Sequence, residues 1–120
     1  MGNLSKKPIF RGDIVLVPFP FTDLSAKKVR PALVISVNNN VDAVVVFISS
    51  VIPNEPCKTE LLLEECHPDF ALTGLKKLSV IKVNKILTLD RQKISRRLGK
   101  LSEVLQSNLD MKLKIAFGLK

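Results

Sequence analysis

The sequence contains no tryptophan, no tyrosine and a single histidine, His67, and these absences exclude several kinds of site within one chain. A pair of catalytic histidines is excluded, because one chain supplies only one imidazole. Aromatic platforms for nucleobases are restricted to the six phenylalanines. The patterns GxxxxGK[ST], HExxH and GxSxG do not occur. Nucleotide hydrolysis, zinc chemistry and serine-hydrolase chemistry therefore lack their usual signatures.

Cysteine is scarce as well. Cys57 and Cys66 lie in a polar segment, and His67 follows the second of them. A disulfide is not expected in a reducing compartment, and two cysteines with one histidine lack the tight CxxC spacing of zinc motifs. We interpret these residues as two free thiols and a surface histidine, and we predict no bound metal and no cofactor.

Long apolar runs are also missing. No run approaches the roughly 18 residues that a membrane span requires, and MGNLSKKPIF lacks the apolar region of a signal peptide. We therefore expect a cytoplasmic protein that does not enter a membrane. A length of 120 residues with 46% hydrophobic residues suits one domain over residues 1–120, with residues 1–9 as a flexible N-terminal tail.

Basic charge is abundant and concentrated. The chain has a net charge of +8, and residues 76–100 alone carry nine basic residues against one aspartate. Residues 55–69 form a smaller acidic segment. A solvated basic face without a partner is one interpretation, but this concentration favours a phosphate-binding face.

Arginine suits chemistry at such a face, because it stays protonated and presents a planar fork that matches phosphate. A rigidly held arginine beside hydroxyl donors can stabilise a phosphate that is attacked by the 2′-hydroxyl of an RNA. This reaction takes its nucleophile from the substrate and needs no metal.

Short apolar runs separated by turn residues predict antiparallel strands. The clearest runs are residues 14–19, 32–37 and 42–48, and the three asparagines at 38–40 predict a hairpin over residues 32–48. Residues 59–63 predict a further strand. Residues 78–90 predict one or two more, with Ile81 and Val83 on one face, Val80 and Lys82 on the other, and a kink at Asn84 and Lys85.

The last segment has helical spacing. Ser102 is a suitable N-cap, Glu103 favours the positive end of a helix dipole, and Gly118 is a suitable stop. The chain thus predicts a mainly β (α+β) fold, a small SH3-like barrel of five to seven short antiparallel strands closed by a C-terminal amphipathic helix. The expected apolar stripe of this helix consists of Leu101, Val104, Leu105, Leu109 and Leu113.

Several stretches together resemble the MazF/PemK family of toxin endoribonucleases. They are GDIVLVPFPFTDLSAKKVRPALVIS at 12–36, VVVFISSVIP at 44–53, GLKKLSVIKVNKILTLDR at 74–91 and LGKLSEVL at 98–105. The resemblance implies an SH3-like barrel that forms a homodimer and cleaves single-stranded RNA at short sequences without metal. It also implies an antitoxin protein whose acidic, disordered tail occupies the RNA groove.

The resemblance assigns catalysis to Arg30, which matches the family's arginine and is held extended by Pro31. Ser49 takes the place of the family's threonine as a hydroxyl donor, and Ser50 and Asp23 are further possible catalytic residues. Arg30 could instead form a structural salt bridge with Asp13 or Asp23, the serines could make only local hydrogen bonds, and Asp23 could cap a turn.

The expected RNA contacts come from the first loop and from the basic run. The chain has Lys82-Val83-Asn84 where some family members have Arg-x-Asp, and it has no glutamate or histidine at residues 24–28, so no general base is assigned. The predicted RNA-binding residues are Thr22, Lys27, Lys28, Lys82, Asn84, Lys85 and Arg91.

Two other functions stay open at this point. One is a toxin without enzymatic activity that binds a protein target such as DNA gyrase, and the other is a plain nucleic-acid-binding barrel that has lost catalysis. For dimerisation, Leu33, Ile35 and the helix stripe offer apolar surface, unless the barrel core uses all of it.

Overall fold

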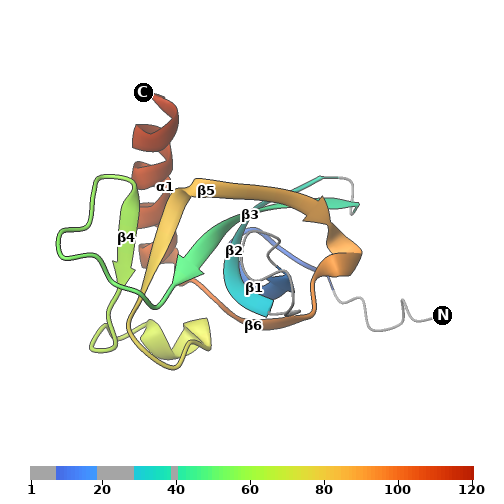
Figure 1. Ribbon diagram of the computed structural model, residues 1–120, viewed down its shortest axis with the longest axis horizontal. Coiled ribbons are helices and arrows are strands. Elements are labelled where there is room, and N and C mark those ends of the chain that lie inside the picture. The colour runs from blue at the N-terminus through green and yellow to red at the C-terminus, as the bar shows by residue number, and fades with distance from the viewer. Residues whose placement is uncertain (1–7, 19–28, 39–40) are drawn as a thin grey trace.

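Six strands form one antiparallel sheet in the computed structural model, which describes residues 8–18, 29–38 and 41–120. The strand order is β4-β5-β3-β2-β1-β6, and the sheet is curled (Figure 1). The predicted hairpin of residues 32–48 is confirmed, because β2 and β3 pair antiparallel. The elements are β1 (Asp13–Pro18), β2 (Val29–Asn38), β3 (Asp42–Ser49), β4 (Glu60–Leu63), η2 (Phe70–Thr73), β5 (Ser79–Asp90), η3 (Arg91–Lys93), β6 (Arg96–Lys100) and α1 (Glu103–Phe117).

Side chains that alternate along the strands build an apolar cluster on each face of the sheet. Ile14 and Leu33, which are paired across β1 and β2, belong to one cluster, which we call the helix-side core. Val15 and Ala32 are the next pair and belong to the other cluster, which we call the open-side core. Both faces of the central strands are therefore apolar.

A shift in register bends β5. Val46 pairs with Ile86, but the next residue, Phe47, pairs with Lys82, so residues 83–85 have no partner on β3. The N–H of Val83 instead donates to the carbonyl of Thr59 at 3.0 Å. Such an insertion bends the strand that carries it. The kink predicted at residues 84 and 85 is thus confirmed, and β5 turns beside α1 and then crosses to η3 (Figure 1).

Helix α1 covers the helix-side core. Its N-cap is Ser102, whose Oγ accepts a hydrogen bond from the N–H of Leu105 at 3.3 Å, and Gly118 ends it at φ +68°. Leu105 and Leu109 are buried against the sheet. The predicted stripe was wrong at Val104, which is 59% exposed. Successive helical residues point about 100° apart, so Val104 does not share the buried side of Leu105.

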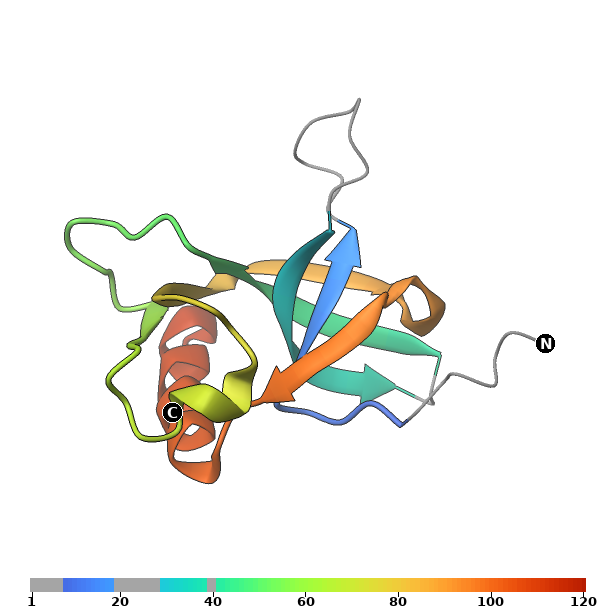
Figure 2. The same ribbon diagram turned by 90° about the horizontal axis from the view of Figure 1, so that it is seen from below.

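Strand β6 was not predicted, because RRLGK has no apolar run. It forms through backbone pairing with β1, and η2 packs on it (Figure 2). A Cβ on Gly99 would lie 2.2 Å from the carbonyl oxygen of Leu72, and one on Gly74 would lie 2.1 Å from that of Leu98. Only glycine permits backbones to approach this closely.

Other expectations need smaller corrections. Strand β1 begins at Asp13 and β3 extends to Ser49, while Phe19, the predicted end of the first strand, lies outside the described residues. Leu33 is fully buried in the helix-side core, so it is not available as dimer surface, whereas Ile35 is half-buried. The part of the chain that the structure describes has no helix long and apolar enough to span a membrane.

Candidate active site

Arg30 lies near the start of β2, at the end of the sheet where β1 stops. Its register partner on β1 is Val17, a member of the open-side core. Directly paired residues project from the same face of a sheet, so Arg30 belongs to the open-side face. Arg30 is exposed, while Val17 and Ala32 on either side of it are buried. A rigid apolar base thus supports a solvent-facing guanidinium.

Ser49 is the last residue of β3 and is half-buried. Its Oγ accepts a hydrogen bond from the N–H of Val51 at 3.0 Å. This contact is the local hydrogen bond expected if Ser49 has no catalytic role. It uses the oxygen as an acceptor, so the hydroxyl hydrogen still points elsewhere and can be donated to a phosphate oxygen. Ser50 follows and is exposed.

The pairing of β2 with β3 brings Arg30 and Ser49 together. Leu33 pairs with Val46 and Ala32 with Phe47, where the pairing of the two strands ends. Extending this register by two residues puts Arg30 opposite Ser49. Pro31 has no N–H, which explains why the hydrogen-bonded ladder stops before this point. Neighbouring strands lie about 4.8 Å apart, so the guanidinium and the hydroxyl can reach one phosphate.

Lys82 extends this face toward β4. Phe47, Lys82 and Glu60 are consecutive partners across β3, β5 and β4, and Phe47 also packs against the open-side core. A hydrogen bond from the backbone N–H of Cys57, 2.8 Å from Oε1, lowers the pKa of Glu60, and the charge of Lys82 lowers it further. Lys82 therefore stands between an aromatic ring and a carboxylate.

The other predicted site residues are placed differently. Asn84 and Lys85 are exposed in the unpaired insertion of β5. Arg91 begins η3 and donates its N–H to the carbonyl of Val41 at 2.8 Å, at the opposite end of β3 from Ser49. The structure thus brings Arg30, Ser49 and Lys82 to one face and does not bring Arg91 to them. Thr22, Asp23, Lys27 and Lys28 lie outside the described residues.

Asp13 forms its salt bridge with Arg97 and not with Arg30. Its Oδ1 lies 3.2 Å from Nε of Arg97, and its Oδ2 accepts a hydrogen bond from the N–H of Phe10 at 2.9 Å. Asp13 is 3% exposed, so this carboxylate belongs to the framework of the fold. The alternative in which Arg30 forms a structural salt bridge with Asp13 was therefore wrong.

The cysteines and the histidine make local contacts. Both thiols are free and exposed, as expected, and Sγ of Cys57 lies 3.3 Å from Oγ1 of Thr59. Nδ1 of His67 accepts a hydrogen bond from the N–H of Asp69 at 3.0 Å. Among residues 8–18, 29–38 and 41–120, no three histidine, cysteine or acidic side chains are placed to hold a metal ion.

The sequence matches one family model over residues 10–117, that of the PemK-like, MazF-like toxin of type II toxin-antitoxin systems. The chain belongs to this toxin family. Comparison with curated protein sequences gave no match.

Solved structures share the fold of this toxin. An endoribonuclease in complex with its cognate antitoxin from a mycobacterial species is 17% identical and has a TM-score of 0.71, with 94% of this chain and 98% of that chain covered. The Mycobacterium tuberculosis toxin MazF-mt6 is 20% identical, with a TM-score of 0.68 and coverages of 90% and 98%. MazF from Deinococcus radiodurans is 19% identical, with a TM-score of 0.64 and coverages of 93% and 97%. The curled sheet closed by one helix is therefore the fold that these toxins share.

Sequence reasoning missed two members of the toxin's open-side face. Phe47 has no sequence signal of a site residue beyond its place in an apolar run, because only the pairing of β3 with β5 sets it opposite Lys82. Glu60 belonged to the acidic segment, and its nearness to Lys82 depends on the pairing of β4 with β5. Neither relationship has a local signature in the sequence.

Proposed function

We propose that this toxin is an endoribonuclease that cleaves single-stranded RNA, mRNA included, at short sequences without a metal ion. The observation that supports the proposal is the register of β2 and β3, which pairs Ala32 with Phe47 and, extended by two residues, puts the exposed Arg30 opposite Ser49 beside a buried apolar base. Membership of a toxin family supports it, as does the likeness to structures described as endoribonucleases.

The proposed reaction is an internal transfer at one phosphate. The 2′-oxygen of the substrate forms a bond to phosphorus, and the bond between phosphorus and the 5′-oxygen of the next nucleotide breaks. The products are a 2′,3′-cyclic phosphate and a 5′-hydroxyl end. The proton of the 2′-hydroxyl passes to a base, and the leaving oxygen takes up a proton from an acid or from water.

Arg30 supplies charge in this scheme. Its guanidinium cannot act as a base at neutral pH, but it can donate two parallel hydrogen bonds to the phosphate oxygens, on which negative charge grows. Ser49 adds one neutral donor, held in place by its contact with Val51, and Ser50 is a further donor at the same strand end. Lys82 binds the RNA backbone from the neighbouring strand.

The general base is a group other than Arg30, Ser49 and Lys82. Glu60 is a carboxylate on this face, but its lowered pKa makes it a weak base, and β3 and β5 separate it from Arg30. We retain Asp23, which lies between β1 and β2 in the sequence, as a proposed base. Water is the remaining acceptor, and a toxin that depends on it cleaves slowly.

We further propose that the toxin acts in the cytoplasm as a homodimer and that an acidic antitoxin silences it. Two of the similar structures are described as complexes, one with a cognate antitoxin and one as MazE–MazF from Deinococcus radiodurans. The basic residues of segment 76–100 suit an acidic partner. Sedimentation at micromolar concentration tests the dimer, and a species that remains monomeric would contradict it.

The test of the activity is the mapping of new 5′ ends in a long single-stranded RNA that has been incubated with the purified toxin in excess EDTA. We expect cuts at a recurring short sequence, and we expect Arg30→Ala to reduce the rate about 10²-fold or more while the protein stays folded. An intact RNA with folded wild-type toxin overturns the proposal. No observation favours a gyrase-directed toxin or a binding protein without activity.

A further inference from the structure

The three side chains that the proposed chemistry uses do not select a cut site. Arg30 and Ser49 bind the scissile phosphate and Lys82 binds the backbone, and every nucleotide offers them the same phosphate. Bases of a single strand are read by groups that form hydrogen bonds with their Watson–Crick and Hoogsteen edges. A residue that selects the sequence therefore needs a hydrogen-bonding group that faces the RNA beside these three side chains.

Glu60 lies beside Lys82 on the open-side face. The two residues are register partners across β4 and β5, and Lys82 is also the partner of Phe47 on β3, so all three project from one face of the sheet. All three residues are half-buried. Strand β4 runs alongside the first part of β5 (Figure 1). Three strand spacings, about 14 Å along the sheet, separate β4 from β2, so Glu60 is placed to meet a nucleotide away from the cut bond.

The carboxylate of Glu60 is held in place and keeps acceptor capacity. Its Oε1 accepts a hydrogen bond from the backbone N–H of Cys57 at 2.8 Å, and the N–H of Glu60 donates to the carbonyl of Cys57 at 3.0 Å. The thiol of Cys57 is a second donor to the carboxylate. An ionised carboxylate accepts about four hydrogen bonds, so about two positions remain. Within the part of the chain that the structure describes, Glu60 forms no salt bridge with Lys82.

A fixed anion at this position suits a base better than a phosphate. The pKa of Glu60 lies below the ordinary value of 4.5, chiefly because of the backbone N–H of Cys57, so the carboxylate is ionised at neutral pH and only accepts hydrogen bonds. Lys82 attracts a phosphate and Glu60 repels it. A nucleotide bound at this pair is therefore oriented with its phosphate toward Lys82 and its base toward Glu60.

Guanine matches a carboxylate better than the other RNA bases do. Its Watson–Crick edge presents two neighbouring donors, N1–H and the N2 amino group, which the two carboxylate oxygens can accept together. Adenine and cytosine present an amino group beside a ring nitrogen that is itself an acceptor, and uracil presents one N–H between two carbonyl oxygens. With these bases, a carboxylate gains one hydrogen bond and meets a second acceptor that repels it.

We propose that Glu60 determines the sequence specificity of the toxin by binding the Watson–Crick edge of a guanine, while Lys82 binds an adjoining phosphate. This inference rests on the proposed ribonuclease function and deepens it, because it names one base of the recognised sequence and the residue that reads it. Cut sites are then expected to carry a guanine at a fixed distance from the cut bond.

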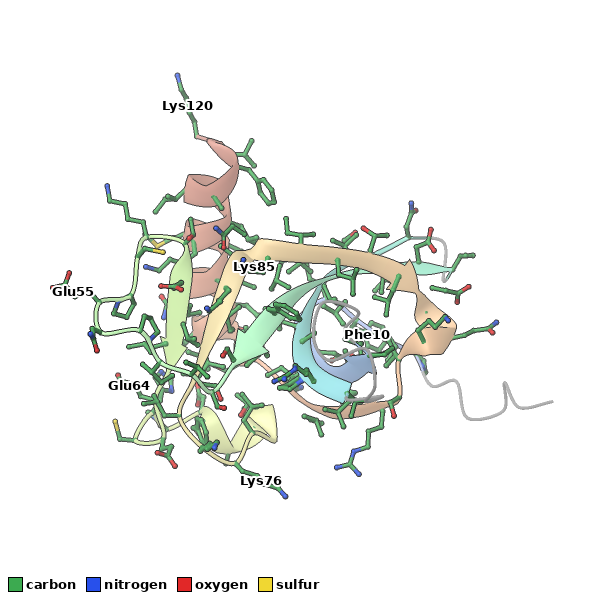
Figure 3. All side chains as sticks on the ribbon, in the orientation of Figure 1. Phe10, Glu55, Glu64, Lys76, Lys85 and Lys120 are labelled. Carbon is green, nitrogen blue, oxygen red and sulfur yellow. The ribbon has the colours of Figure 1, made fainter. Side chains whose placement is uncertain are left out.

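Binding tests the reading of guanine separately from cleavage. In the Arg30→Ala background, which leaves the RNA intact, Glu60→Gln is compared with Glu55→Gln. Both variants lose one negative charge from segment 55–69, and Glu55 is exposed and points away from the body of the fold (Figure 3). The probes are a short oligouridylate and the same strand with one central guanosine, adenosine or inosine, of which inosine lacks the N2 amino group. The Kd of each probe is measured.

With Glu60 present, we expect the guanosine probe to bind about tenfold more tightly than oligouridylate, and the inosine probe to have an intermediate affinity. Glu60→Gln keeps one acceptor oxygen and adds a donor, so its preference should fall to within about twofold, whereas Glu55→Gln should keep the preference. Equal Kd values for guanosine probe and oligouridylate with Glu60 present overturn the inference, and this comparison does not depend on the folding of a variant. A folded Glu60→Gln variant that binds every probe more tightly by one factor also overturns it and shows that Glu60 only repels the backbone.

Cleavage with Arg30 intact separates this inference from the proposed function. We expect wild type and Glu55→Gln to cut at sequences with a guanine at one fixed position. For Glu60→Gln, the ratio of kcat/KM between that substrate and its adenosine counterpart should fall about tenfold. A wild-type toxin that does not cleave contradicts the proposed function alone, because the comparison of probes still decides the role of Glu60. A toxin that cleaves at sequences without a fixed guanine contradicts the role of Glu60 alone.

Discussion

Nε of Arg97 lies 3.2 Å from Oδ1 of Asp13, and this pair fastens β6 to the beginning of β1. Asp13 is 3% exposed and has the N–H of Phe10 as its second donor, whereas the side chain of Arg97 is 46% exposed. Of the two adjacent arginines on β6, one thus belongs to the framework and the other, Arg96, faces solvent. Two arginines that are neighbours in sequence therefore have different tasks.

Loss of the framework arginine is expected to destabilise the fold. Arg97→Ala leaves a buried carboxylate with one donor and should lower the free energy of unfolding by about 1–3 kcal/mol. Arg96→Ala is the matched control and should change it by no more than about 0.5 kcal/mol. Urea unfolding measures both values. Equal effects of the two substitutions would show that the contact with Asp13 contributes nothing.

The close approach of η2 to β6 leads to a second prediction, which concerns the stability of glycine variants. Gly99→Ala places a Cβ 2.2 Å from the carbonyl oxygen of Leu72. Because backbone cannot move aside as a flexible side chain does, we expect the free energy of unfolding to fall by about 1–3 kcal/mol. Gly118→Ala meets no atom within 4 Å, and its positive φ of +68° should cost about 1–2 kcal/mol. Thermal unfolding ranks the two variants, and backbone amide shifts should change around Leu72 in the first alone.

Ser49 should act through its hydroxyl group. We expect Ser49→Ala to reduce the rate of RNA cleavage about 10²-fold, as for loss of one donor to a charged transition state, with little change in Tm. Ser49→Thr keeps the donor and restricts its rotamers, so its rate should stay within about tenfold of the wild-type rate. Single-turnover cleavage assays measure both rates. Full activity of Ser49→Ala would reduce the role of Ser49 to its local contact with Val51.

The pKa of the Glu60 carboxyl group should lie below the ordinary glutamate value of 4.5, chiefly because the backbone N–H of Cys57 donates to it. A hydrogen bond from the Cys57 side chain is the next cause, and the charge of Lys82 is the last. A pKa that is lower in the folded state means that the carboxylate stabilises the fold above pH 4.5 and that this contribution is lost as pH falls through the lowered value. Carboxyl NMR titration should give this direction. Lys82→Gln should raise the pKa of Glu60 only slightly, since the charge of Lys82 is the least of the causes that lower it.

The pH dependence of unfolding provides a second check on Glu60. Wild type should lose more stability than Glu60→Gln as pH falls from 4.5, because the variant has no carboxylate to protonate. Parallel curves for the two proteins would contradict the assignment.

The sequence predicted the strands and the helix where the signal is local. Apolar runs bounded by turn residues marked β1, β2 and β3, and Ser102 and Gly118 marked the ends of α1. It failed for β6, because RRLGK is polar and becomes a strand only through its pairing with β1. It also misplaced Val104 and left open whether Leu33 belongs to the core or to a dimer surface, because apolar character alone does not distinguish a residue inside the core from one on the surface.

For the site, the sequence showed, through its resemblance to the toxin family, that Arg30 before Pro31 and the serines at 49 and 50 are the groups expected to act on a phosphate. The tertiary structure decided which groups share a face. The register of β2 and β3, extended two residues past the pair Ala32 and Phe47, puts Arg30 opposite Ser49. Strand pairing also places Lys82 between Phe47 and Glu60 and leaves Arg91 at the far end of β3. The physical reason is that pairing depends on backbone hydrogen bonds between segments distant in sequence, and no local pattern of side chains encodes that register.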